Sequence, residues 1–443
     1  MILTRLPADW RSRLAPETSK DPRNHGTETI LKRELATILV LASGTTAAIA
    51  EPKINFGDAA SLEIYGRVQV GLEYLHTGTT YIPDNTFSPN QGNPVLDDNG
   101  RFISTNTPSH FRLRNQRSVI GFRGDVKIND DLKAVWQIES SAAADGGGGL
   151  HVPVQTWANR DSGVGIESQT FGRIIFGSWQ TPYTHATFGY DPYYTTTGAY
   201  MGIMGNGSGA SSDPISDPAT FDRREHNLIQ YWSPDINGFK MRLGFEVNEF
   251  KTGQQNANPA LNIAAAPAQN PYMVSLETTY DKGPLNVTFA SEAHHQYQVG
   301  GGTDLGVKFG AAYWFHNTTR LAGIVQRLHY KAADGDLAQN QYYLSLIHKF
   351  TAQDQFKLGY AVGSQVSGSS KQIIGYLRAG PESASKILTI GVEHQFNKYF
   401  ALLTYWSKTF NQANAFMDFP INDTAPAMGT SPSVFALLGR FSF

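Results

Sequence analysis

Residues 433–443, which end the chain, read SVFALLGRFSF. One set of alternate positions holds Phe435, Leu437, Gly439, Phe441 and Phe443. Arg440 and Ser442 belong to the other set, so the apolar side chains recur with the period of a β-strand. The end of a soluble chain commonly frays, yet here a strand with one apolar face runs to the last residue. The stretch therefore raises the question of which solvent that face meets.

The same period of two recurs along the chain from about residue 60. It is clear in SLEIYGRVQVGLEY (61–74), in FKMRLGFEVN (239–248) and in DLGVKFGAAYWF (304–315). In each stretch one set of positions is apolar, and the other carries isolated charged or polar residues beside glycine. A helix would need apolar spacings of three and four, so these stretches predict strands.

Counting such stretches between turn signals predicts about sixteen strands. They lie near 61–76, 111–128, 131–141, 157–168, 171–179, 224–233, 238–249, 272–281, 284–297, 303–316, 318–330, 341–351, 354–365, 385–396, 398–410 and 433–443. The connections alternate between short turns, such as SPDINGF and FHNTTR, and long polar loops. The long loops are expected near 77–110, 142–156, 180–223, 250–271, 331–340, 366–384 and 411–432, with a shorter one near 298–302. This asymmetry is typical of outer-membrane barrels, with short periplasmic turns and long external loops.

The solvent of the apolar faces follows from this arrangement. After residue 60 no segment approaches the ~18–20 continuous apolar residues of a membrane helix. A sheet in lipid must close, because open edges leave backbone groups unpaired, and sixteen strands enclose a ring wide enough for water. A soluble sandwich or solenoid is the alternative, but it does not explain charged residues beside glycine on the opposite faces. We therefore expect an all-β protein, a 16-stranded antiparallel transmembrane β-barrel.

The composition and the start of the chain indicate the cellular compartment of the protein. The formal net charge is −2, which gives no indication of nucleic-acid binding, and cysteine is absent. Residues 31–50 predict a secretory signal peptide: Lys32 and Arg33 precede an apolar run, which ends in Ala48-Ile49-Ala50. Residues 1–30 are expected to be an overcalled or unstructured extension, and 51–443 a single barrel domain. No cofactor and no metal site is expected.

The chain from the first strand to its end resembles the Gram-negative general porins, which are sixteen-stranded trimeric diffusion channels. The resemblance rests on EIYGRVQVGLEY, SVIGFRGDVKINDDLKAVWQIE, VGIESQTFGRIIFG, NLIQYWSPDINGFKMRLGF and the terminal LLGRFSF, which occur in the family's order. It implies a homotrimer packed through its early strands in the outer membrane of a Gram-negative bacterium. It also implies that the third long loop folds inward and narrows the pore.

The resemblance implies a row of basic residues on the pore wall, facing acids on the third loop. The wall positions fall on Arg67, Arg160 and Arg224, with Arg223 close by. Two family arginines are missing here, at Val119 and Ser178, and Arg117 is expected to replace the first. The alternation places Arg67 and Arg117 on the polar faces of their strands, whereas the face of Arg160 stays open. A rim charge or an ion pair within the wall is the alternative for each arginine.

The third loop, near 180–223, is rich in glycine, tyrosine and threonine, and it lacks the family's acidic Pro-Glu-Phe-Gly-Gly element. Asp191 is the best candidate for the loop acid; Asp213, Asp217 and Asp222 are weaker candidates. Phe441 and Phe443 are expected at the membrane edge of the closing strand, within an aromatic girdle.

These features predict passive diffusion of ions and small hydrophilic solutes through a water-filled lumen, with a mild preference for anions. A substrate-specific porin for a sugar or an anionic solute is the alternative, in which loop tyrosines form a slide; the candidates are Tyr190, Tyr193, Tyr194 and Tyr200. An outer-membrane enzyme or an adhesin barrel is less favoured. The chain has no Gly-x-Ser-x-Gly elbow, and adjacent His294 and His295 point to opposite faces of a strand.

Overall fold

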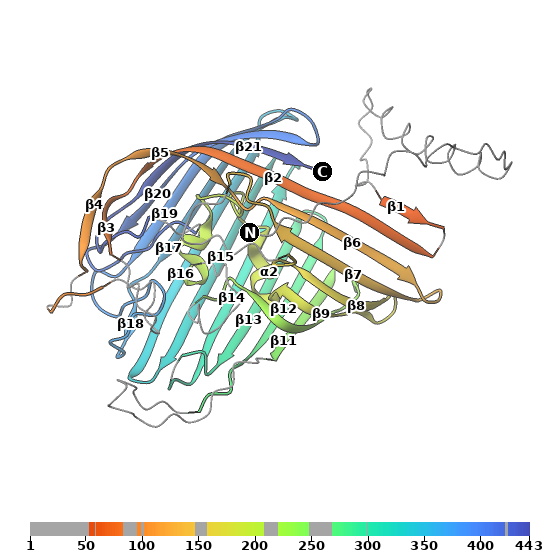
Figure 1. Cartoon of the computed structure of the whole chain (residues 1–443), viewed down its shortest axis with the longest axis horizontal. Coiled ribbons are helices and arrows are strands. Elements are labelled where there is room, and N and C mark those ends of the chain that lie inside the picture. The colour runs from red at the N-terminus through yellow and green to blue at the C-terminus, as the bar shows by residue number, and fades with distance from the viewer. Residues whose placement is uncertain are drawn as a thin grey trace, which may run out of the picture. The chain divides into compact units, whose positions relative to one another are not determined.

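The computed structural model describes residues 53–57, 59–82, 95–98, 102–146, 157–207, 220–247, 268–298, 300–420 and 424–443. These residues belong to one unit of the chain, 51–443, and form a closed 16-stranded antiparallel β-barrel (Figure 1). The expected extension 1–30 and signal peptide 31–50 lie outside the described residues. No described helix has the length and hydropathy needed to cross a membrane.

The wall strands follow the chain in order around the barrel. They are β2 (Ala60–His76), β5 (His110–Asn115) with β6 (Val119–Lys127), β7 (Leu132–Ser141), β8 (Ser162–Ser168), β9 (Gly172–Gln180), β10 (Arg224–Trp232), β11 (Phe239–Val247), β12 (Tyr272–Lys282), β13 (Leu285–His295), β14 (Thr303–Phe315), β15 (Thr319–Ala332), β16 (Gly335–Lys349), β17 (Asp354–Gly363), β19 (Ser385–Gln395), β20 (Phe400–Asn411) and β21 (Ser433–Ser442). Smaller strands are β1 (Lys53–Phe56), β3 (Gly78–Tyr81), β4 (Ser104–Thr107) and β18 (Ser367–Gly368).

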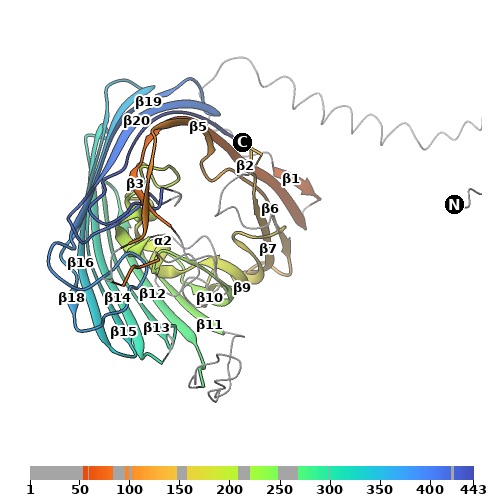
Figure 2. The same ribbon diagram turned by 60° about the vertical axis from the view of Figure 1, so that its left-hand side comes forward.

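The barrel closes between its first and last wall strands. β2 pairs with β21 from Arg67↔Ser442 to His76↔Ser433, and its other edge pairs with β5 and β6. The backbones of Gly66 and Phe443 exchange two hydrogen bonds, of 2.8 and 3.0 Å. The terminal stretch is therefore paired to the last residue, and Figure 2 shows the resulting ring of strands.

The alternation of side chains follows the sequence pattern. On β2, Val68, Leu72 and Tyr74 are exposed on the outer face, whereas Gln69 and Glu73 are buried inside. β11 and β14 have the same division, and β21 likewise has aromatic and aliphatic residues outside. The prediction of an apolar exterior and a polar interior is confirmed for β2, β11 and β14, whereas the inner face of β21 is apolar at Val434, Ala436 and Leu438.

One predicted loop is wrong. The charged and glycine-containing stretch 331–340 was expected to be a long loop, but β15 and β16 pair as far as Ala332↔Gly335. Ala333 and Asp334 form the two-residue turn of this hairpin, and Leu337 and Gln339, which follow it, are buried strand residues. Tight turns join the opposite ends of the strands at the positions expected from the sequence.

The second wall strand is interrupted, which the sequence did not indicate. β5 pairs as Val70↔Asn115 and β6 as Arg67↔Val119, so one extra residue is inserted between them. This bulge contains Arg117 in the left-handed region, at φ 59°. Bulges of this kind redirect side chains and are frequent beside functional sites.

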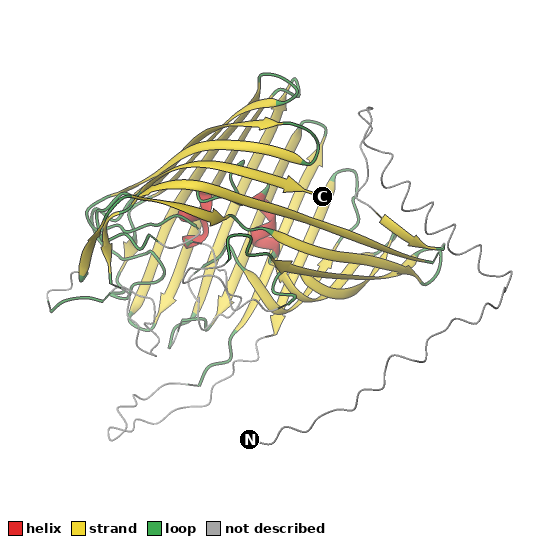
Figure 3. Cartoon of the chain, turned by 45° about the horizontal axis from the view of Figure 1, so that its top comes forward, coloured by secondary structure: helices red, strands yellow, loops and turns green. Residues whose placement is uncertain are grey.

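The described part of the third long loop, which connects β9 to β10, lies inside the barrel (Figure 3). Its described part contains α2 (Pro182–Phe188), η1 (Tyr200–Gly202) and η2 (Met204–Asn206). Figure 3 shows the helices within the ring of strands. Thr181 caps α2 by accepting a hydrogen bond from the Thr184 amide, and Pro182 opens the helix. The loop thus enters the lumen directly at the end of β9.

Candidate functional site

Arg67 and Arg117 meet on the inner wall. Arg67 Nη2 donates to the carbonyl oxygen of Arg117 at 2.7 Å, so the bulge that exposes this carbonyl also positions the Arg67 side chain. The Arg117 guanidinium lies 5.9 Å from the centre of the Tyr194 ring and, through Nη1, 3.8 Å from Met201 Sδ on the loop. The pair therefore spans the space between the wall and the loop.

Arg160 and Arg224 hold carboxylates on the next strands. Arg160 Nε lies 2.6 Å from Glu139 Oε1, and Arg224 Nε lies 2.7 Å from Asp161 Oδ1. Tyr65 donates to the other oxygen of Glu139 at 3.0 Å. The predicted wall arginines Arg160 and Arg224 thus take part in ion pairs, which was the alternative considered for each.

The wall carries an excess of positive charge. Arg67 and Arg117 interact electrostatically with each other, and both interact with Arg160; Arg117 also interacts with Arg224. Glu139 and Asp161 offset two of these four charges. The described loop residues that keep some exposure are all without a carboxylate: His185, Phe188, Gly189, Pro192, Tyr194 and Thr195. Among the described residues, the field at this site is therefore positive.

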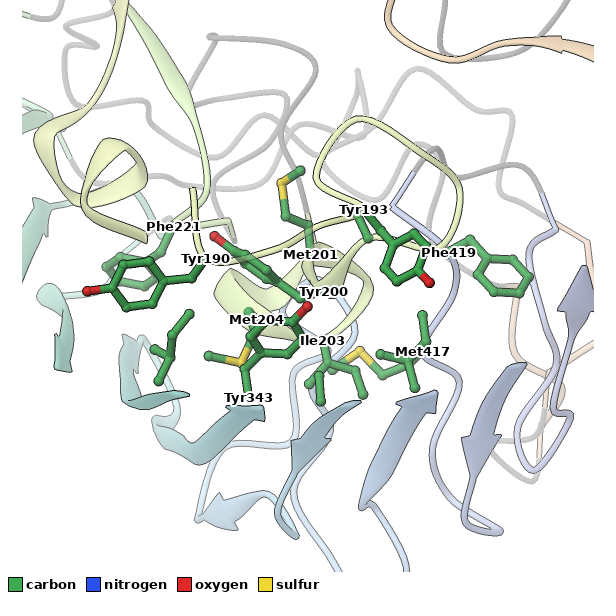
Figure 4. Packing of buried hydrophobic residues seen from close by; sticks show 14 of the residues in the cluster. Tyr190, Tyr193, Tyr200, Met201, Ile203, Met204, Phe221, Tyr343, Met417 and Phe419 are labelled. Carbon is green, nitrogen blue, oxygen red and sulfur yellow. The ribbon is translucent and has the colours of Figure 1, made fainter. Parts of the chain in front are cut away.

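The loop is fixed to the opposite wall by hydrogen bonds to its backbone. Ser345 donates to the carbonyl of Tyr190 at 2.7 Å, and Thr389 donates to that of Gly198 at 2.7 Å. Tyr193 in turn donates to the carbonyl of Lys357 at 2.8 Å. Apolar residues fill the space between the loop and this wall, as Figure 4 shows for Met204, Tyr343 and their neighbours.

The expected role of Asp191 as a pore-facing acid is wrong. Its side chain is buried, and both oxygens accept hydrogen bonds within the protein. Oδ1 accepts from the Tyr343 hydroxyl at 2.7 Å and from the Tyr193 amide at 2.9 Å, and Oδ2 accepts from the Tyr200 amide at 2.7 Å. Asp191 therefore organises the fold of the loop.

Of the other candidate acids the structure describes only Asp222, which interacts electrostatically with Arg117 but is not exposed to the lumen. Asp222 is buried, 3.6 Å from Lys308 Nζ. Lys308 also donates to Thr187 Oγ1 at 2.9 Å, so it connects both ends of the loop to β14. Asp213 and Asp217 lie outside the described residues.

The four candidate tyrosines of the third loop do not form an exposed surface. Tyr190, Tyr193 and Tyr200 are buried between the loop and the wall, whereas Tyr194 is half-buried. Gln180 donates to the Tyr194 hydroxyl at 2.9 Å. A slide made of all four rings is therefore excluded, because three of them are buried.

Arg223 is not a lining residue. Its side chain is fully buried, forms an ion pair with Glu225 and lies 5.1 Å from the centre of the Tyr297 ring. Arg223 precedes β10, so the alternation of that strand does not determine its direction. The neighbouring Arg224, which begins the strand, points to the wall cluster instead.

Phe441 and Phe443 lie where the closing strand ends. Phe441 is exposed on the outer face, 6.1 Å from the ring centre of Tyr399 and 6.1 Å from that of Phe443. Tyr399 belongs to the tight turn between β19 and β20. The aromatic residues thus cluster at the short-turn end of the barrel, as a girdle requires.

Three important residues were missed from the sequence. Glu139 and Asp161 are the partners of the wall arginines, and Lys308 anchors the loop. Lys308 lies in the polar set of its strand, which was a usable signal. The pairing of Asp161 with Arg224 joins residues that are far apart in the sequence, so only the fold brings it out.

Comparisons with known proteins agree with this architecture. Residues 36–412 match the family model of Gram-negative porins. Outer membrane porin protein 32 of Delftia acidovorans is 27% identical over 376 residues, which cover 84% of this chain and 88% of that protein. An outer membrane porin protein of Bordetella pertussis is 27% identical over 264 residues, 59% of each chain.

Solved structures share the fold. An anion-selective porin from Comamonas acidovorans superposes with a TM-score of 0.65 at 20% identity, over 87% of this chain and 100% of that one. The trimer form of OmpT from Vibrio cholerae gives a TM-score of 0.56 at 12% identity, over 87% and 100% of the two chains. With the closed barrel, these findings make the protein an outer-membrane channel for passive diffusion. The chain belongs to the Gram-negative porin family.

Proposed function

We propose that this diffusion channel prefers anions over cations. The observation that supports the proposal is the wall cluster, in which four arginines face two carboxylates, while the acids Asp191 and Asp222 of the described loop are buried. Fixed wall charge sets ion preference through its local field, and arginine stays charged at any physiological pH. The Comamonas acidovorans porin of the same fold is described as anion-selective.

The reversal potential in a KCl gradient across a planar bilayer tests this proposal. The wild-type channel should give a chloride-to-potassium permeability ratio above one. Replacing Arg67→Ala and Arg117→Ala together should lower the ratio about two- to fivefold, equivalent to about 0.4–1 kcal/mol. The matched control is Arg327→Ala, an exposed arginine whose guanidinium donates to Asn340 at 2.8 Å. Cation preference of the wild type would refute the proposal.

We also infer that the protein assembles as a homotrimer through its early strands. β8 has 7 residues and β9 has 9, whereas β15 has 14 and β16 has 15. A strand needs about 9–11 residues to cross the hydrocarbon core, so the wall at β8 is too low to face lipid alone. The outward Val164 and Ile166 of β8 are well exposed in the single chain. Neighbouring copies would cover this low wall.

Single-cysteine cross-linking tests the trimer, because the chain contains no cysteine. Val164→Cys on β8 should give dimers and trimers with a short bis-maleimide. Val325→Cys, on the exposed outer face of the tall β15, should remain uncross-linked. Equal cross-linking at both positions, or a monomeric mass in detergent, would contradict the assignment.

We infer finally that the channel has no catalytic activity. Support comes from the sequence, which lacks the nucleophile elbow and metal-binding helix motifs. His294 is buried and contacts Glu292 at 2.9 Å, whereas His295 contacts Thr303, so the doublet is divided between two environments. Lipase and esterase assays on the purified protein should give no turnover above a mock preparation.

A further inference from the structure

A cavity of about 680 Å³ lies between the inward loop and the ends of the strands near the short turns. Its lining comes from α2 and the residues after it, and from β10 to β15. The volume is within the ~300–1,000 Å³ typical of small-molecule sites. A solute that has passed the arginine wall toward the short turns would meet this cavity next.

The cavity combines aromatic rings with cations. Phe188, Tyr190, Trp232 and Trp314 line it, together with Lys240, Arg242 and Arg320. Glu277 and Asp281 are its only carboxylates among the described lining residues, so cations outnumber anions there. Ligand sites typically have this composition of apolar walls and a few polar groups that fix orientation.

Two of the three cations are already balanced. Arg242 lies 3.8 Å from Glu277, and Lys240 lies 3.8 Å from Asp281. Glu277 also contacts His185 Nδ1 at 2.9 Å. These groups therefore hold one another and leave little net charge for a ligand.

Arg320 is the remaining cation. Its Nη1 donates to the carbonyl of Gly189 at 2.8 Å, and its guanidinium lies 5.5 Å from the centre of the Tyr190 ring. No described carboxylate lies within ion-pair distance of it. The hydrogen bond to the loop fixes the guanidinium at the cavity wall, where its other N–H groups can meet an anion.

Trp314 lies beside Arg320. The two residues pair directly across β14 and β15, and both line the cavity. Directly opposed side chains on one face start about 5 Å apart, so one small ligand can contact Arg320 and Trp314 together. Trp314 has one cation near its ring, Lys349 at 4.8 Å, whereas Trp232 has two, Arg173 and Arg242, at 5.0 and 4.5 Å.

We propose that this cavity is a binding site for small aromatic carboxylates. The carboxylate pairs with Arg320 while the ring packs on Trp314. This inference rests on the proposed function, because an anion-preferring pore delivers such solutes to the cavity. Binding must be weak enough for release, as conduction requires, so the site would enrich aromatic acids without trapping them.

The test uses the full-length protein reconstituted in planar bilayers with benzoate as the probe. Benzoate added on the short-turn side should reduce the chloride current with saturation, whereas acetate, which lacks a ring, should require at least about tenfold higher concentration. Arg320→Gln should raise the concentration of benzoate that blocks half of the current about fivefold or more. Arg327→Gln, the same change on another arginine of β15, should leave it unchanged. Trp314→Leu should raise the half-blocking concentration of benzoate and leave that of acetate unchanged.

The outcomes separate this inference from the pore proposal. Equal half-blocking concentrations of benzoate and acetate would refute the site, and so would an unchanged block by benzoate in Arg320→Gln. If glucose competes with benzoate, the cavity is a sugar site instead. If Arg320→Gln does not insert, the wild-type comparison of benzoate with acetate still decides. Reversal potentials measured in KCl before benzoate is added report the ion preference alone. Saturable benzoate block in a cation-preferring pore would refute the pore proposal and support the site.

Discussion

Substitution of Asp161 tests how a single residue contributes to the net charge of the arginine wall. Its Oδ1 accepts from Arg224 at 2.7 Å and from the Gln180 amide at 3.0 Å, so Asp161→Asn keeps an acceptor there and removes one negative charge. We expect the chloride-to-potassium permeability ratio to rise about two- to threefold, equivalent to about 0.4–0.7 kcal/mol. This direction is opposite to that expected for loss of Arg67. Reversal potentials in a KCl gradient measure it.

The control for Asp161→Asn is Asp354→Asn. Asp354 carries the same charge at the start of β17, beside the short turns, where it contacts His394 at 2.7 Å. The control should leave the permeability ratio unchanged. A ratio that does not rise for Asp161→Asn would mean that the freed Arg224 does not face the ion path.

Strand residues could be predicted from the sequence, and loop residues could not. The period of two gives the direction of Arg67 because a strand has only two faces. No such rule applies to Asp191 or Tyr193, whose burial depends on Tyr343 and Lys357, more than 140 residues away along the chain. Their environment is set by tertiary contacts between the loop and the wall.

The hydrogen bond from Tyr343 to Asp191 holds the inward loop against the barrel wall. Tyr343→Phe removes one hydrogen bond from the buried Asp191 and leaves its ring in position. A buried polar group that loses a partner costs about 1–3 kcal/mol, so the loop should move more often and single-channel current noise should increase. The control is Tyr342→Phe, the neighbouring tyrosine on the outer face of β16. Equal noise in both variants would contradict a latch at Asp191.

Glycines on the inner face of β14 allow the loop to pack closely against this strand. A Cβ at Gly310 would meet Tyr190 at 2.6 Å, and one at Gly306 would meet Phe221 at 2.6 Å. Gly310→Leu should therefore displace the loop and change the single-channel conductance. Gly323→Leu on β15 is the control, because the nearest atom to its added Cβ is 3.7 Å away. An unchanged conductance in Gly310→Leu would show that the loop is not seated there.

At the scale of elements, the sequence predicted the strands well and their connections less well. The 331–340 loop was wrong because charged residues and Asp334-Gly335 indicate a turn without fixing its length. The bulge at Arg117 carries no glycine to mark it, so the break between β5 and β6 was invisible in the sequence. The positive wall depends on that bulge, which exposes the carbonyl that Arg67 binds.

The whole molecule depends on ring closure, which was predictable because lipid leaves no alternative. An open edge in the hydrocarbon core would leave backbone groups unpaired at several kcal/mol each. The closing pair joins β2 to β21, and its outer aromatic residues meet the membrane edge. The C-terminal strand therefore has two separable roles, backbone closure and side-chain anchoring.

Deletion of residues 441–443 separates these two roles. It removes the pairing of Val68 with Phe441 and both hydrogen bonds between Gly66 and Phe443, so the seam opens at the short-turn end. The matched full-length variant, Phe441→Leu with Phe443→Leu, keeps the backbone pairs and removes only the rings. After refolding from urea into detergent micelles, without any cellular assembly machinery, the deletion should lower the unfolding temperature of the unboiled barrel far more than the double substitution does. If the double substitution were as harmful as the deletion, the aromatic anchors rather than the closing hydrogen bonds would hold the end of the ring together.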